Sequence, residues 1–178
     1  MFQDGRSRRV VFLAHCLLNQ NAISDGTAAA PAVLREVVDT FLDADVGIVQ
    51  MPCPEFSCLG LDRGDIHGAE RPVVEENTRI RAEMRKPGPE RLLTALVEQV
   101  VAQILDYHRH GFEIVGIVGA NRSPSCGVDT TSRNNREVPG QGVFLAKLAQ
   151  RLEEEGIAVP MMGVKASDGS ILKLRELL

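Results

Sequence analysis

The chain alternates short apolar runs with amphipathic segments, and this alternation limits the folds that it can adopt. The apolar runs are residues 10–14, 46–51, 112–118 and 157–164. The amphipathic segments with apolar side chains at helical spacing are residues 31–42, 90–110 and 141–155. Runs without polar alternation are typical of parallel strands covered on both faces, and helices between them predict right-handed βαβ connections. We therefore predict an α/β fold, a three-layer Rossmann-like sandwich with a mainly parallel sheet.

Local signals refine this prediction. Pro160 lies inside the last apolar run and predicts an edge strand, because proline has no N–H for a central ladder. Residues 52–68 and 119–140 carry turn-forming residues and are expected to be loops, and residues 71–86 to be helical in part. Ser167-Asp168 would cap a last helix that ends at Leu178.

Size and charge narrow the class of protein. The 178 residues fit one domain, residues 1–178. A net charge of −4 and the absence of Trp argue against a nucleic acid polymer as partner. No signal-peptide pattern and no apolar run of about 18 residues is present, so we expect a cytoplasmic protein without a membrane partner.

Four cysteines carry most of the functional information. In a reducing compartment, metal binding or catalysis is a better use for them than disulfides. Cys16 and Cys53 each follow a predicted strand by two residues, and Cys126 lies in the loop after the third strand. Because the carboxyl ends of parallel strands share one edge, where α/β folds bind ligands, we expect these three thiols to converge.

Three thiolates favour one of two metal centres. A zinc ion with one open position would act as a Lewis acid, and a three-cysteine iron–sulfur cluster would leave one iron without a protein ligand. Paired C-x-x-C motifs, typical of structural zinc, are absent. Cys58 follows Cys53 by five positions, either as a fourth ligand or as a spare thiol, and we favour the spare thiol.

Several motifs, in this order, resemble the thiouracil desulfurase (TudS-like) family, and more closely its branch of TudS-related desulfidases. They cover about residues 9–164, nearly the whole chain. The motifs are His15-Cys16-Leu17-Leu18-Asn19-Gln20-Asn21 with Asp25-Gly26, Gln50-Met51-Pro52-Cys53-Pro54-Glu55, Gly60-Leu61-Asp62-Arg63, Ser123-Pro124-Ser125-Cys126-Gly127, and Pro139-Gly140-Gln141-Gly142-Val143-Phe144.

The resemblance implies a 4Fe-4S cluster held by Cys16, Cys53 and Cys126, with the fourth iron open to the sulfur of a small thiocarbonyl substrate. It implies Glu55 as the acid–base carboxylate and Ser123 as a substrate contact. The founding desulfurases carry a second Cys and an Arg-Tyr-Asp-Gly motif where this chain has residues 22–26 as Ala-Ile-Ser-Asp-Gly. This difference concerns the substrate, thiouracil in particular, more than the cluster.

The function expected is therefore an iron–sulfur-dependent desulfidase. It would release sulfide from a thiocarbonyl compound, such as a thiolated nucleobase, by non-redox Lewis-acid catalysis. The alternatives are a zinc-dependent hydrolase that uses the same three cysteines, and a non-enzymatic iron–sulfur sensor with Cys58 as fourth ligand.

Two further expectations concern the rim of the sheet. The helix that begins near Gly142 would offer free N–H groups to a substrate anion, and His15 would be a surface or loop residue.

Overall fold

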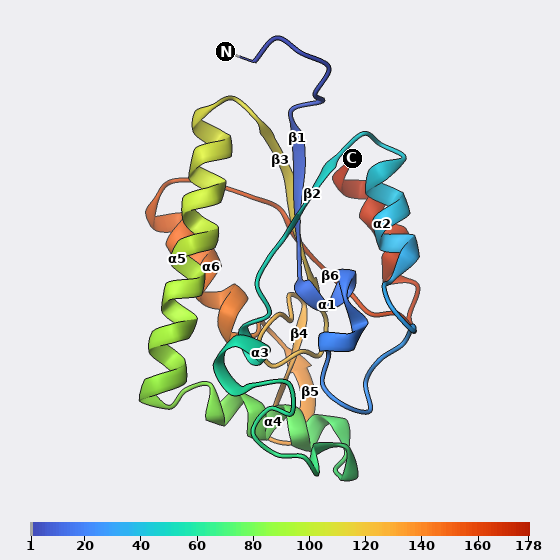
Figure 1. Cartoon of the computed structure of the whole chain (residues 1–178), viewed down its shortest axis with the longest axis vertical. Helices are drawn as coiled ribbons and strands as arrows, with labels where there is room; N and C mark the ends of the chain where they lie inside the picture. The colour runs from blue at the N-terminus through green and yellow to red at the C-terminus, as the bar shows by residue number, and fades with distance from the viewer. Residues whose placement is uncertain (1) are drawn as a thin grey trace.

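A parallel four-stranded sheet forms the centre of the computed structural model, which describes residues 2–178 (Figure 1). The strand order is β2-β1-β3-β6, and every neighbouring pair is parallel. The strands are β1 (Arg9–Leu13), β2 (Gly47–Gln50), β3 (Glu113–Ala120) and β6 (Met161–Val164). The predicted parallel sheet is confirmed, and β6 lies at an edge directly after Pro160, as the proline predicted.

Helices cover both faces of this sheet. In Figure 1, α5 (Pro87–Arg109) and α6 (Val143–Glu154) lie on one side, while α2 (Arg35–Leu42) and the 3₁₀ helix η3 (Ser170–Leu177) lie on the other. The helices of each pair contact one another. The layers are therefore helix, sheet and helix, which confirms the predicted α/β sandwich.

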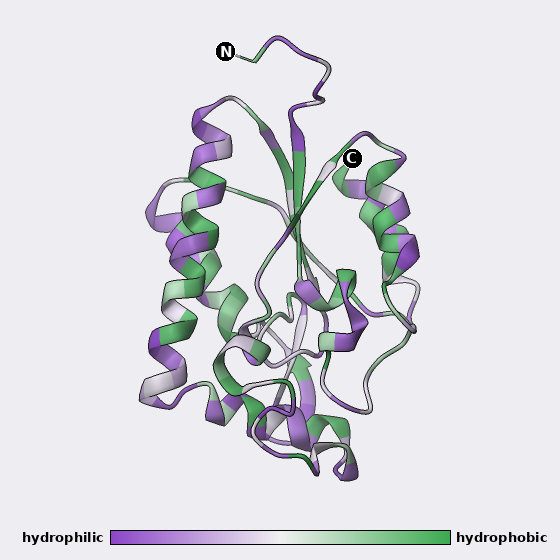
Figure 2. Cartoon of the chain, viewed as in Figure 1, coloured by the Kyte–Doolittle hydropathy of each residue, from purple (hydrophilic) through white to green (hydrophobic). Residues whose placement is uncertain are grey.

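The core follows from this covering of both faces. Val11, Phe12 and Leu13 of β1 expose no surface, although consecutive strand residues point to opposite faces. On α5, the stripe predicted from helical spacing is buried at Leu93, Val97, Val100, Val101 and Ile104. Figure 2 shows apolar residues along the central strands and on the inward sides of the helices. Burial of these apolar side chains stabilises the three layers. The loops that carry the cysteines leave from one edge of the sheet that these layers hold in place.

Helix boundaries differ from the predicted ones for local reasons. α5 begins at Pro87, three residues earlier than predicted, because its two prolines occupy the first turn, where their missing N–H groups cost nothing. α2 begins at Arg35 rather than at residue 31. The last predicted helix is 3₁₀ and begins after Gly169, which has a φ of 74°.

The segments predicted as loops contain further structure. The hairpin of β4 (Thr130–Arg133) and β5 (Arg136–Pro139) turns at Asn134 and Asn135, whose φ angles of 53° and 56° suit a primed two-residue turn. The other short elements are α1 (His15–Leu18), η1 (Gln20–Ala22), α3 (Pro54–Leu59), η2 (Gly68–Glu70) and α4 (Val73–Glu83).

None of the helices within residues 2–178 combines the length and the apolar character needed to cross a membrane.

Candidate functional site

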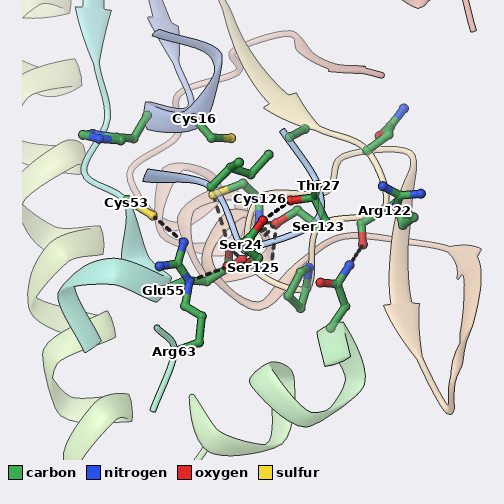
Figure 3. Close-up of a pocket in the computed structure, with 16 residues that line it drawn as sticks. Cys16, Ser24, Thr27, Cys53, Glu55, Arg63, Arg122, Ser123, Ser125 and Cys126 are labelled. Atoms are coloured by element: carbon green, nitrogen blue, oxygen red, sulfur yellow. Dashed lines mark hydrogen bonds and ion pairs between the residues drawn. The ribbon is translucent and has the colours of Figure 1, made fainter. Parts of the chain in front are cut away.

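A pocket lies at the carboxyl edge of the sheet, where β1, β2 and β3 end. It holds about 560 Å³ of space free of protein atoms, its mouth included. The five residues singled out from the sequence, namely Cys16, Cys53, Glu55, Ser123 and Cys126, all line it (Figure 3). Cys16 lies on α1 after β1, Cys53 caps α3 after β2, and Cys126 lies in the loop after β3.

The three pocket thiols are close enough to influence one another. Burial raises the pKa of Cys16 to about 12, and the charges of Cys53 and Glu55 add to the shift. Burial likewise raises the pKa of Cys53 to about 11, with a further contribution from Glu55. The pKa of Cys126 lies well above its usual value because of burial and then the charges of Cys16 and Cys53. In the metal-free protein these thiols are therefore protonated at neutral pH, and a metal must displace their protons.

The spacing of these donors bears on the kind of centre that they fit. Within residues 2–178, no three His, Cys, Asp or Glu side chains converge closely enough to hold a single metal ion. Three thiols nevertheless line one pocket, and soft thiolates are the usual ligands of iron–sulfur clusters.

Glu55 is the hub of a buried hydrogen-bond network. Its Oε1 accepts from Ser125 Oγ at 2.6 Å and from Ser123 Oγ at 3.2 Å. Its Oε2 accepts from Arg63 Nε at 3.1 Å and from Ser24 Oγ at 3.2 Å. One carboxylate thus joins the loop after η1, the loop after α3, and residues 123–125 before Cys126, which we call the serine loop.

Arg63 is the buried counter-ion of Glu55. The two side chains expose only 3% and 8% of their surface. Arg63 Nη1 donates to the carbonyls of Gly60 and Leu61, while Nη2 donates to the Ala22 carbonyl at 2.6 Å and lies 3.9 Å from Cys53 Sγ. Every N–H of this guanidinium therefore has a protein acceptor. The sequence indicated Arg63 only as part of a family motif and indicated no role for it.

Ser123 organises the loop that carries Cys126. Its Oγ accepts from the backbone N–H groups of Ser125 and Cys126 at 3.2 and 3.0 Å. Ser125 Oγ also lies 3.5 Å from Cys126 Sγ. The two hydroxyls therefore hold both Glu55 and the Cys126 loop.

The N-terminus of α6 hydrogen-bonds to the loop that carries Cys126. The expectation that its N–H groups meet a substrate anion is therefore wrong. The N–H groups of Gly142, Val143 and Phe144 donate to the carbonyls of Gly127, Pro124 and Ser125 at 2.9–3.0 Å. A Cβ on residue 142 would lie 2.7 Å from the Cys126 nitrogen, so glycine is required for this close approach.

His15 also differs from its expectation, because it is half-buried and lines the pocket. Its Nδ1 hydrogen-bonds the side-chain amide of Gln50, and its Nε2 is buried without a partner among residues 2–178. Burial, followed by the Arg63 charge, lowers the pKa of His15. The other three histidines, His67, His108 and His110, are exposed.

Cys58 lies apart from the pocket thiols. It sits on α3, and its Sγ donates to the carbonyl of Pro89 in α5 at 3.5 Å. It does not line the pocket.

Comparison with known proteins places this chain among its relatives. The family profile described as 2-thiouracil desulfurase matches residues 11–162. An uncharacterized protein of Methanocaldococcus jannaschii is 28% identical over 124 residues, which are 69% of this chain and 70% of that protein. A solved structure of a [4Fe-4S]-dependent thiouracil desulfidase, TudS, aligns with 96% of this chain and 99% of its own, at 16% identity and a TM-score of 0.46. This chain belongs to the 2-thiouracil desulfurase family.

Proposed function

We propose that this protein is a desulfidase that converts a small thiocarbonyl compound and water into the corresponding carbonyl compound and hydrogen sulfide. The reaction balances without an oxidant or reductant, because sulfur leaves at the oxidation level at which it arrives. The observation that carries the proposal is the gathering of three thiols and a hydrogen-bonded carboxylate around one pocket in a member of this family.

Cys16, Cys53 and Cys126 would hold the 4Fe-4S cluster. The donor set fits this group, since all three residues are soft thiols that line one pocket. When bound, the cluster supplies an open iron that polarises the C=S bond as a Lewis acid. The position of Cys58 away from the pocket supports a centre with three protein ligands.

Glu55 would move the proton. It lies at the pocket wall, where it is able to accept a proton from the attacking water and later return it. Ser125 Oγ donates to Glu55 Oε1 in the structure. Because a protonated carboxyl donates its own hydrogen bond, the Ser125 hydroxyl would turn and accept. The Ser125 hydroxyl thus keeps Glu55 Oε1 hydrogen-bonded in either protonation state.

Matched cysteine variants test this assignment. We expect anaerobically reconstituted wild-type protein to hold about four iron and four sulfide per chain. It should also release sulfide from 2-thiouracil or a related thiocarbonyl compound. Cys53→Ser and Cys126→Ser should lose most of the cluster and the activity, while Cys58→Ser should keep both.

Two outcomes would contradict the assignment. Loss of the cluster in Cys58→Ser but not in Cys53→Ser would show that the assigned ligand set is wrong. A protein that binds zinc tightly and keeps its activity in air would favour a zinc hydrolase instead.

A further inference from the structure

Arg81 is a buried arginine that lies behind the serine loop and outside the pocket lining. It belongs to the last turn of α4, and only 9% of its surface is exposed. Its Nη1 donates to the Pro124 carbonyl and to Thr131 Oγ1, each at 3.1 Å. Its Nε is buried without a hydrogen-bond partner among residues 2–178. The proposed reaction makes no use of this side chain, so its burial needs another explanation.

The charge of Arg81 has no counter-ion among residues 2–178. Both of its acceptors are neutral oxygens, and no carboxylate forms an ion pair with it. Burial lowers the pKa of Arg81, and the charges of Arg85 and Arg133 lower it further. The carboxyl end of α4 favours a cation, but this contribution is smaller than the cost of burying an unpaired charge. Arg81 therefore differs from Arg63, which is equally buried but is paired with Glu55.

The contacts of Arg81 lead to the loop that carries Cys126. The peptide bond after Pro124 accepts from Arg81 through its carbonyl and donates through its N–H to Ser123 Oγ at 3.2 Å. The same Ser123 Oγ accepts from the Cys126 N–H at 3.0 Å. Thr131 Oγ1 accepts from Arg81 and donates to the Ser123 carbonyl at 2.8 Å. Two hydrogen-bonded paths therefore join this guanidinium to the serine loop.

The two acceptors of Arg81 do not depend on it for a hydrogen bond. The Pro124 carbonyl also accepts from the Val143 N–H at 2.9 Å, and the Thr131 hydroxyl keeps the Ser123 carbonyl as its acceptor. A neutral side chain of similar length, such as methionine, would leave neither group unpaired and would remove the unpartnered Nε. Holding the loop in place therefore does not by itself require a cation at residue 81.

A 4Fe-4S core held by three thiolates would supply the negative charge that Arg81 lacks. The positive charge of the core is smaller than the summed charge of the thiolates, so the bound cluster is an anion. Cys126, one of the three proposed ligands, follows Pro124 by two residues. Charges that are shielded from water interact more strongly than charges in solvent, so a buried guanidinium behind this loop would stabilise such an anion.

We propose that Arg81 is a positioning residue that balances the negative charge of the bound cluster and acts on it through the serine loop. This inference rests on the cluster of the proposed function and deepens that function, because it assigns a residue that retains the cofactor. It also has a consequence for stability. Arg81 lowers the stability of the cluster-free protein, in which its charge is unpaired, and raises the stability of the loaded protein.

Arg81→Met tests the inference through effects of opposite sign. In urea unfolding of the cluster-free variant, we expect a midpoint equal to or above that of wild type, because an unpaired buried charge is removed. After anaerobic reconstitution, we expect a chelator to remove iron from the variant at least about 10-fold faster than from wild type. The reduction potential of the loaded cluster should fall, because loss of a buried positive charge disfavours an added electron.

Arg81→Lys and Arg85→Met are the matched controls. Arg81→Lys keeps the charge but loses the planar guanidinium, and it should restore the wild-type potential and most of the iron retention. Arg85 lies four residues after Arg81 and is exposed, so solvent screens its charge. Arg85→Met should therefore change neither the rate of iron release nor the potential.

Two results would overturn the role of Arg81. A cluster-free Arg81→Met protein that is less stable than wild type or fails to fold, with Arg81→Lys equally affected, would show that the guanidinium only supports the loop. Equal iron release and equal potentials in wild type and Arg81→Met would exclude an interaction with the cluster.

Sulfide release separates this inference from the proposed function. If wild type holds the cluster and Arg81→Met loses it faster, but no thiocarbonyl compound releases sulfide, the inference is supported and only the desulfidase function is refuted. If wild type releases sulfide and Arg81→Met retains the cluster equally well, only the inference is refuted. A wild-type protein that takes up no iron would refute both, and the iron count shows this directly.

Discussion

The buried Arg63–Glu55 pair allows a quantitative test of how the pocket is held together. Replacing Arg63 by Met removes the guanidinium and leaves Glu55, whose side chain is 8% exposed, without its counter-ion. Breaking one partner of a buried ion pair costs about 3–5 kcal/mol in free energy of unfolding. For a domain of this size, that corresponds to a fall in Tm on the order of 10 °C.

A double-mutant cycle isolates the contribution of the pair from the other losses. Arg63→Met also leaves the carbonyls of Leu61 and Ala22 without a donor, while the Gly60 carbonyl keeps the backbone N–H of residue 63; this part of the cost does not depend on Glu55. Glu55→Gln removes the charge while preserving the size of the side chain. We therefore expect the double variant to be more stable than the sum of the single changes predicts, with a coupling of about 1–3 kcal/mol.

The assay is urea unfolding of the cluster-free protein under reducing conditions, followed by two probes to check two-state behaviour. A cost below about 1 kcal/mol for Arg63→Met would refute the reasoning, since exposed pairs have values in that range. Strictly additive single and double variants would refute it as well, because they would show that the two side chains do not interact.

Three further predictions follow from the same pocket. Glu55→Gln should lower kcat about 10²- to 10⁴-fold while iron content stays near the wild-type value, and wild-type turnover in this variant would exclude Glu55 as the acid–base group. Gly142→Ala places a Cβ 2.7 Å from the Cys126 nitrogen and should reduce both stability and bound iron. Gly88→Ala, whose Cβ meets no atom within 4 Å, should change neither. Equal effects of the two substitutions in unfolding and iron assays would contradict this prediction. The pKa values of Cys16 and Cys53, about 12 and 11 against the usual 9.0, mean that the folded cluster-free protein keeps protons that the unfolded chain loses. Stability should therefore be full below about pH 9 and decline toward pH 11–12, and a Cys16→Ala/Cys53→Ala variant measured by urea unfolding should show a weaker decline if the reasoning is correct.

The sheet and the position of the site were predictable because they depend on pattern. Apolar runs that do not alternate with polar residues specified the parallel strands, and Pro160 specified an edge. The placement of Cys16, Cys53 and Cys126 after successive strands then indicated that one sheet edge would gather them, and all three line the same pocket.

The parts that sequence reasoning missed depend on contacts between distant segments. Arg63 resembles any other loop arginine in the sequence, and only the fold brings it to Glu55 and to the carbonyl of Ala22. The N–H groups of α6 looked free because their acceptors lie in a loop fifteen or more residues earlier. The hairpin of β4 and β5 was easier to predict from the sequence, since Asn134-Asn135 is a turn signal for the left-handed region.

The measurement that tests the central claim most directly is the balance of products from the anaerobically reconstituted enzyme. With a thiocarbonyl substrate and no added oxidant or reductant, the protein should release sulfide and form the carbonyl compound in equal amounts over many turnovers. An intact cluster with no sulfide released from any thiocarbonyl compound, neutral or anionic, would contradict the account, as would sulfide release that requires an added electron donor.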